Sequence, residues 1–83
     1  MFFSLYLQWK YDKSYSYMSI GAIIKKRRSL LGISQQDLSD YSGVGISTVK
    51  DLERGVGNPS VLTLQKILDV VGLEMNFQVK KTV

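Results

Sequence analysis

Apolar residues recur at intervals of three and four along the middle of the chain, and this spacing predicts four short helices. The first helix is expected to begin after Ser19, whose hydroxyl can cap it. It is expected to end at Gly32, because glycine favours the left-handed conformation that closes a helix. The residues expected on its buried face are Ile20, Ile23, Ile24 and Leu31.

The second and third helices are expected to follow with only a short turn between them. Ser34 precedes the segment QQDLSDY and has Asp37 three residues later, which is the arrangement of a capping box. The pair Ser42-Gly43 ends this second helix, and a third helix is predicted from Ile46 to Arg54.

A fourth helix is predicted between two turn signals. The first is Asn58-Pro59-Ser60, whose serine can also cap the helix, and the second is Gly72. The apolar stripe of this helix consists of Val61, Leu64, Ile67, Leu68 and Val71.

Both ends of the chain change to the alternating pattern of a strand. In residues 1–17 the apolar members of the alternation are Phe3, Leu5, Leu7, Trp9 and Tyr11. Two interpretations stay open for this segment, a strand or a disordered extension. The sequence from Met18 resembles the start of a helical domain, which makes Met18 an alternative start of the protein. The alternating residues at the other end are Leu73, Met75, Phe77 and Val79.

A single strand after four helices cannot satisfy its own backbone hydrogen bonds. We therefore expect the carboxy-terminal strand to pair with the amino-terminal strand or with its counterpart in a second molecule, and the second option predicts a homodimer. The predicted organisation is an amino-terminal extension (1–17), a helical domain (18–72) and a dimerisation strand with its tail (73–83).

The composition narrows the chemistry open to this chain. Its 83 residues make one small domain, whose limited core favours association with another chain. Because it has no cysteine and no histidine, we expect neither an enzyme nor a protein with a metal or another cofactor. The net charge of +4 suits a polyanionic partner. No apolar run is long enough to cross a membrane and the first residues lack the features of a signal peptide, so the expected location is the cytoplasm.

Two short helices joined by a tight, glycine-containing turn form the helix-turn-helix arrangement, in which the second helix enters the major groove of DNA. Residues 43–55, GVGISTVKDLERG, contain this turn and the second of the two helices. Val49 and Leu52 are expected to anchor that helix inward, which leaves its polar face free for DNA.

The segment ISQQDLSDYSGVGISTVKDLERG resembles the phage-repressor-like (XRE/Cro) helix-turn-helix family, and the resemblance extends over about residues 20–72. It implies a mostly α, four-to-five-helix DNA-binding domain. The segment ERGVGNPSVLTLQKILDVVGLEMNFQV is similar to HipB-type antitoxin repressors. This similarity implies a homodimer closed by carboxy-terminal strands that represses its own operon and binds a HipA-like Ser/Thr kinase toxin.

Two other functions stay open beside the antitoxin. One is a free-standing phage-type transcriptional regulator without a toxin, and the other is a protein-interaction module on the same scaffold. The interaction module is favoured by Ile46 and Asp51, which stand on the face expected to read bases. The chain also departs from the family pattern at two positions. Gly45 stands where the family usually has a serine or threonine cap, and Ile46 stands where many relatives have a polar residue that reads a base.

The family resemblance also implies roles for individual side chains. The residues that match its base-reading positions are Ile46, Ser47, Lys50 and Asp51. The residues that match its phosphate-binding positions, or surround its phosphate-binding loop, are Gln35, Thr48, Arg54, Asn58 and Ser60. In the basic run Lys25–Arg28, which otherwise reads as a solvated face, Arg28 matches an arginine that forms a structural salt bridge with the residue matching Glu53.

The chemistry of these side chains limits what each can contact. Ile46 offers only apolar contact, such as with a thymine methyl group, whereas Lys50 can reach guanine acceptors or a phosphate. Asp51 is repelled by phosphates unless its carboxylate accepts a hydrogen bond from a cytosine amine or pairs with Lys50 or Arg54, and we expect the pairing within the chain. Thr48 has two equal interpretations, contact with the DNA backbone or packing. A two-fold dimer predicts an operator that is an inverted repeat with half-site centres about 34–36 Å apart, or a multiple of that distance.

Overall fold

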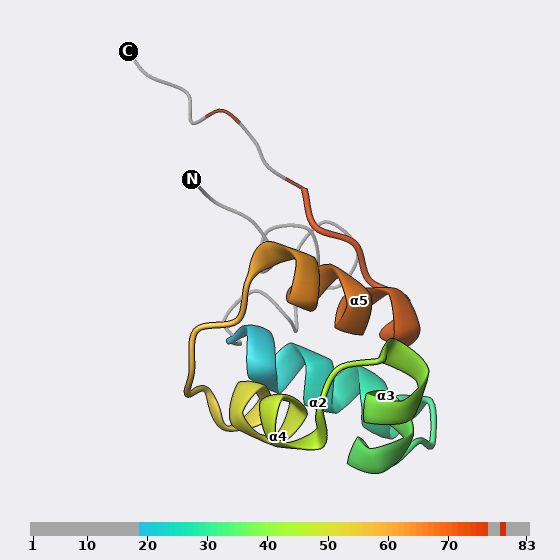
Figure 1. The fold of residues 1–83 in the computed structure, drawn as a ribbon. Helices are drawn as coiled ribbons and strands as arrows, with labels where there is room; N and C mark the ends of the chain where they lie inside the picture. The colour runs from blue at the N-terminus through green and yellow to red at the C-terminus, as the bar shows by residue number, and fades with distance from the viewer. Residues whose placement is uncertain (1–18, 77–78, 80–83) are drawn as a thin grey trace.

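The computed structural model describes residues 19–76 and 79, and these contain four helices. They are α2 (Ile20–Leu30), α3 (Gln35–Ser42), α4 (Ile46–Arg54) and α5 (Val61–Val71), as Figure 1 shows. The four predicted helices are therefore confirmed, and their bounds agree with the positions of the capping residues. The expected strand in residues 1–17, the alternative start at Met18 and the side chain of Phe77 lie outside the described residues.

Three of the helices begin with the serine caps that the sequence predicts. Ser19 Oγ accepts a hydrogen bond from the backbone N–H of Ala22 at 3.2 Å. At the start of α3, Ser34 Oγ accepts from the N–H of Asp37, and the carboxylate of Asp37 accepts from the N–H of Ser34, each at 2.9 Å. Ser60 caps α5 in the same way, whereas α4 begins at Gly45 without a side-chain cap. These caps satisfy donors that a helix start leaves unpaired, so the helix starts are set locally.

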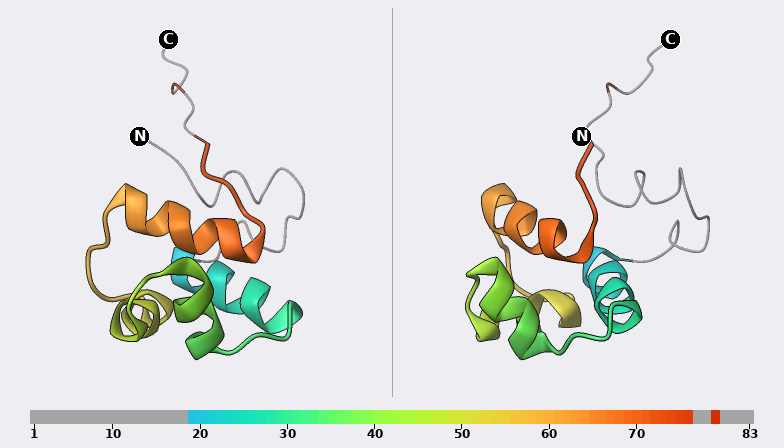
Figure 2. Two further views of the ribbon diagram at one scale, coloured as in Figure 1. Left: turned by 45° about the vertical axis from the view of Figure 1, so that its right-hand side comes forward. Right: turned by 90° about the vertical axis from the view of Figure 1, so that its right-hand side faces the viewer.

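The helices enclose one apolar interior. α2 packs against α4 and α5, and α3 packs against the same two helices. Both views in Figure 2 show α5 and α4 on opposite sides of this interior. The buried apolar residues are Ile23, Ile24, Leu38, Val44, Val49, Leu52, Leu64, Ile67, Leu68, Val71 and Leu73.

Two residues predicted on buried faces are exposed, so these two predictions are wrong. Leu31 is 47% exposed because it caps the carboxy-terminal end of α2, beyond the part of the helix that contacts its neighbours. Val61 is 49% exposed because it is the first residue of α5 and precedes the first full turn that packs on the interior. Helical periodicity does not predict burial at helix ends, because the chain leaves the core there.

The basic run Lys25–Arg28 on α2 includes a side chain that links two helices. Arg27 Nε donates a hydrogen bond to the carbonyl oxygen of Val71 at 3.0 Å, which joins α2 to the last turn of α5. Carbonyl groups at a helix end lack partners within the helix, so this arginine acts as a cap from a neighbouring helix. The family pattern implies a structural contact for Arg28 in this run but none for Arg27.

The chain continues beyond α5 without forming a strand in residues 73–76. Leu73 is buried in the core of its own chain, and Met75 packs against that core while remaining half-buried. Val79 is 98% exposed. Leu73 is therefore committed to the monomer core, and the pairing of this segment with a second molecule stays a prediction. Among the described residues, no helix combines the length and the apolar character that crossing a membrane requires.

Candidate nucleic-acid interface

The turn between α3 and α4 is fixed by hydrogen bonds from the end of α3. Gly43 closes α3 in the left-handed conformation, with φ of 73°. Val44 then inserts its side chain into the core. Its carbonyl oxygen accepts a 2.6 Å hydrogen bond from the buried hydroxyl of Ser39, and its N–H donates to Ser42 Oγ at 3.2 Å. Val44 is thus held by its buried side chain and by hydrogen bonds at both its N–H and its carbonyl group, and this fixes the angle between α3 and α4.

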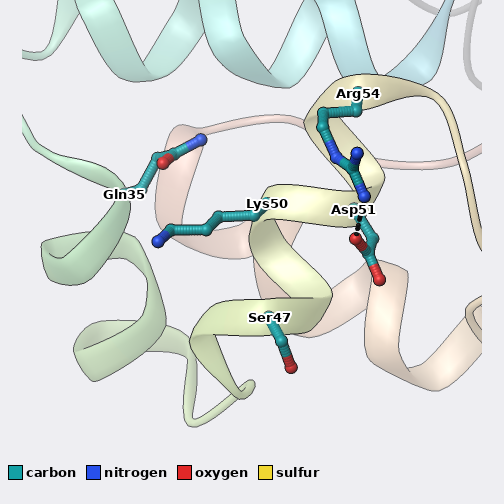
Figure 3. A pocket seen from close by; sticks show the side chains of 5 residues that line it. All are labelled: Gln35, Ser47, Lys50, Asp51 and Arg54. Atoms are coloured by element: carbon teal, nitrogen blue, oxygen red, sulfur yellow. Dashed lines mark hydrogen bonds and ion pairs between the residues drawn. The ribbon is translucent and has the colours of Figure 1, made fainter.

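α4 has one buried face and one exposed face. Val49 is fully buried and Leu52 is 7% exposed, so these two residues anchor the helix in the interior as the sequence predicts. The exposed face borders an open hollow of about 330 Å³ between α3 and α4. Figure 3 shows the residues that line it, which are Gln35, Ser47, Lys50, Asp51 and Arg54.

The charges in this hollow are partly compensated. Arg54 Nη2 and Asp51 Oδ1 form an ion pair at 2.6 Å, one turn apart on α4, and their side chains are 68% and 46% exposed, respectively. The predicted pairing of Asp51 within the chain is therefore present, with Arg54 as its partner. Lys50 extends across the hollow toward the Gln35 side in Figure 3. Within the described part of the chain, Lys50 takes part in no salt bridge, so its charge is available to a ligand.

Behind the hollow, Arg28 and Glu53 form the ion pair that the sequence predicts. Arg28 Nε and Nη2 donate to the two carboxylate oxygens of Glu53 at 2.7 and 2.9 Å, and Arg28 Nη1 donates to the carbonyl oxygen of Ile33 at 3.0 Å. The Glu53 side chain is 3% exposed and that of Arg28 is 13% exposed. The hydrogen bond and the charge of Glu53 raise the pKa of Arg28, although burial opposes this. The pair joins α2, the α2–α3 loop and the end of α4.

Gln35 is the first residue of α3 and connects this pair to the hollow. Its Nε2 donates a hydrogen bond to Glu53 Oε1 at 3.2 Å, the same oxygen that accepts from Arg28 Nη2. The family pattern implies a phosphate contact for Gln35 but does not imply this hydrogen bond to Glu53. The Gln35 side chain therefore contacts the ion pair of Arg28 and Glu53 and also lines the edge of the hollow.

The remaining predicted contact residues lie outside the hollow. Ile46 and Thr48 are half-buried on α4, and Asn58 is exposed in the α4–α5 loop. The Ser60 hydroxyl accepts from the N–H of Thr63 at 3.1 Å and donates to Thr63 Oγ1 at 3.0 Å. Ser60 therefore serves as the cap of α5, and its hydroxyl hydrogen is already used within the chain.

Within the described residues, only a part of the basic charge lies at this face. Lys10, Lys13, Lys80 and Lys81 lie outside the described residues. At the hollow itself, Lys50 and the paired Arg54 are the basic residues. Within residues 19–76 and 79 the structure holds no cluster of three or more acidic, histidine or cysteine side chains suited to a metal ion. The hollow offers polar groups and one ammonium that has no ion-pair partner among the described residues, which suits the edges of bases and phosphate oxygens.

The sequence of this segment also matches known proteins. The sequence model of the helix-turn-helix family matches residues 24–78, which include α3, the turn and α4. A curated relative, the SPbeta prophage-derived uncharacterized HTH-type transcriptional regulator YonR of Bacillus subtilis (strain 168), is 32% identical over 62 residues. The match covers 75% of this chain and 57% of the relative, so the chain spans little more than half the length of that protein.

Proposed function

This chain belongs to the helix-turn-helix family, and we propose that it is a sequence-specific DNA-binding transcriptional regulator without enzymatic activity. The observation that carries the proposal is the exposed face of α4. This face holds Ser47, Lys50 and Arg54 around an open hollow, while Val49 and Leu52 fix the opposite face in the core. A helix held in this way can enter the major groove without rearranging the fold.

The exposed side chains divide into two groups by their chemistry. Ser47 and Lys50 carry polar groups that read base edges, Ile46 contributes apolar contact, and Asp51 restrains Arg54. Arg54, Gln35, Thr48 and the backbone near Asn58 and Ser60 contact the phosphates on either side. Contacts of the second group fix the register of the protein on the duplex, and contacts of the first group select the sequence.

The regulator binds DNA as a homodimer, in this proposal, and acts as a repressor. The small core and the alternating pattern of Met75, Phe77 and Val79 support pairing of this segment between two molecules. Leu73 contributes to it only indirectly, because its side chain lies in the core of its own chain. The expected operator is an inverted repeat with half-site centres about 34–36 Å apart, or a multiple of that distance. Sedimentation equilibrium of the full chain and of its Phe77→Asp variant tests the dimer, which the carboxylate should weaken.

A free-standing regulator is the first form of this proposal, and an antitoxin that binds a HipA-like kinase is the second. The prophage-derived regulator named YonR supports the first. The antitoxin depends on the HipB-type sequence similarity, whose strand pattern begins in residues 73–76, where the structure has no strand. Purification of tagged protein from its host distinguishes them, because a stoichiometric kinase-like partner would establish the antitoxin and its absence would leave the free-standing regulator.

Selection from a duplex library with a randomised central segment tests DNA binding directly. We expect enrichment of one inverted repeat and a dissociation constant for it at least about a thousandfold below that for an unrelated duplex. The logarithm of the association constant should fall linearly with the logarithm of salt concentration, with a slope of about −0.9 for each phosphate contacted. A chain that enriches no sequence and binds all duplexes equally weakly would instead support the protein-interaction module.

A further inference from the structure

Glu53 is placed to influence DNA binding without contacting DNA. Its side chain is 3% exposed, so a duplex at the exposed face of α4 cannot reach it. Yet its Oε1 atom accepts a hydrogen bond from Nε2 of Gln35, which lines the hollow. Any effect of Glu53 on a ligand in the hollow must therefore pass through another residue, and Gln35 provides that connection.

The carboxylate itself is held firmly. Arg28 donates to both of its oxygens, and Arg28 is in turn held by the carbonyl oxygen of Ile33. Gln35 therefore attaches to a group that is fixed by three segments of the fold. A glutamine on a helix surface ordinarily samples many rotamers and loses that freedom when it binds a ligand, so prior attachment reduces the cost of binding.

The chemistry of the carboxylate also determines which way the amide of Gln35 faces. An ionised carboxylate only accepts hydrogen bonds, so the amide must turn its nitrogen toward Glu53. One N–H is used in this bond, and no described residue accepts from the other N–H, so a ligand at the edge of the hollow can accept from it. Across the hollow, Lys50 extends toward the same side, as Figure 3 shows.

We propose that Glu53 is a positioning residue for DNA binding: through its hydrogen bond to Gln35 it holds the Gln35 amide ready to contact a phosphate of the duplex. This inference rests on the proposed DNA-binding function. It gives Glu53 a second role beside its ion pair with Arg28, and it separates that role from stability. The two roles make different predictions for a double-mutant cycle.

The cycle uses the wild-type chain, Glu53→Gln, Gln35→Ala and the double variant, with the duplex enriched by selection as the probe. Circular dichroism defines a temperature at which all four chains are folded, and dissociation constants are measured there. We expect Glu53→Gln to weaken binding about fivefold in the wild-type background and less than about twofold in the Gln35→Ala background. Gln36→Ala is the matched control, because Gln36 donates to Asp40 and not to Glu53.

Equal effects of Glu53→Gln in the two backgrounds would overturn the inference, because a purely structural role adds the same loss to each. A wild-type chain that binds no duplex would overturn the proposed function and the inference with it. If the wild-type chain binds the selected duplex and the effects of Glu53→Gln and Gln35→Ala are additive, the inference alone is overturned.

A second measurement needs no substitution at Glu53, whose replacement can impair folding. Nuclear magnetic resonance relaxation of side-chain amides in the free wild-type chain should show the Gln35 amide more ordered than that of Gln65, which is exposed on α5. Equal mobility of these two amides would contradict the proposed attachment.

Discussion

Gly21 of α2 lies directly against the backbone of Leu52 in α4. A Cβ atom at position 21 would overlap the carbonyl oxygen of Leu52 and would lie 3.1 Å from the Cα atom of Glu53. Arg28 follows Gly21 by two helical turns on the same face of α2, so the close approach of the two helices also brings Arg28 to Glu53. The absence of a side chain at one position thus makes room for the contact between α2 and α4.

Substitution of Gly21 by alanine should destabilise the protein by about 1–3 kcal/mol, because the added methyl group forces α2 away from α4. Helix propensity alone predicts the opposite sign, since alanine is favoured over glycine by about 1 kcal/mol within a helix. Urea unfolding of Gly21→Ala measures the net effect. Ser29→Ala on the exposed side of α2 is the control and should change stability by less than about 0.5 kcal/mol. A more stable Gly21→Ala chain would show that α2 and α4 accommodate a methyl group at position 21.

Truncation of Glu53 to alanine should cost about 3–5 kcal/mol, because it leaves the guanidinium of Arg28 largely buried without its anionic partner. The exposed ion pair provides the comparison. Asp51→Ala removes the partner of Arg54, whose side chain is 68% exposed, and should cost less than about 1 kcal/mol. Both changes are measured by chemical unfolding at low temperature. Similar values for the two variants would show that burial does not separate these pairs.

The helix bounds could be predicted because their signals are local. Ser19, Ser34 and Ser60 each bond to a backbone N–H three residues later, and Gly43 and Gly72 adopt the left-handed conformation at helix ends. Such contacts involve neighbours in the sequence, so the sequence contains all the information they need. The tight approach at Gly21 depends on a residue 31 positions away and has no comparable local signal.

The candidate site was predictable to the extent that a family pattern supplied the long-range pairs. The pairing of Arg28 with Glu53 came from that pattern, whereas the bond from Arg27 to Val71 and the bond from Gln35 to Glu53 did not. Each of these three contacts joins residues that are at least 18 positions apart in the sequence. Amphipathic periodicity identifies the face of a helix that is buried, but it does not say which neighbouring polar group an arginine or a glutamine will reach.

Ser39 should be needed for a well-defined turn between α3 and α4. Its buried hydroxyl donates to the carbonyl oxygen of Val44, so Ser39→Ala leaves a buried carbonyl without this partner and should cost about 1 kcal/mol. The better helix propensity of alanine offsets a part of this loss. Hydrogen exchange of the amides of residues 43–45 should become faster relative to the rest of the chain. Ser29→Ala serves again as the exposed control, and unchanged exchange in the turn would contradict this role of Ser39.

Lys50 should contribute to sequence selection rather than to general attraction. Its side chain extends into the hollow from the middle of α4 and has no salt-bridge partner among the described residues. If it donates to guanine acceptors, Lys50→Ala should cost about 1–3 kcal/mol on the selected duplex and relax the preference at one position of each half-site. Lys66→Ala, on α5 and away from the hollow, should leave both quantities unchanged. If Lys50→Ala instead weakens binding to all duplexes equally and reduces the salt slope by about 0.9, Lys50 contacts a phosphate and the reading of bases falls to its neighbours on α4.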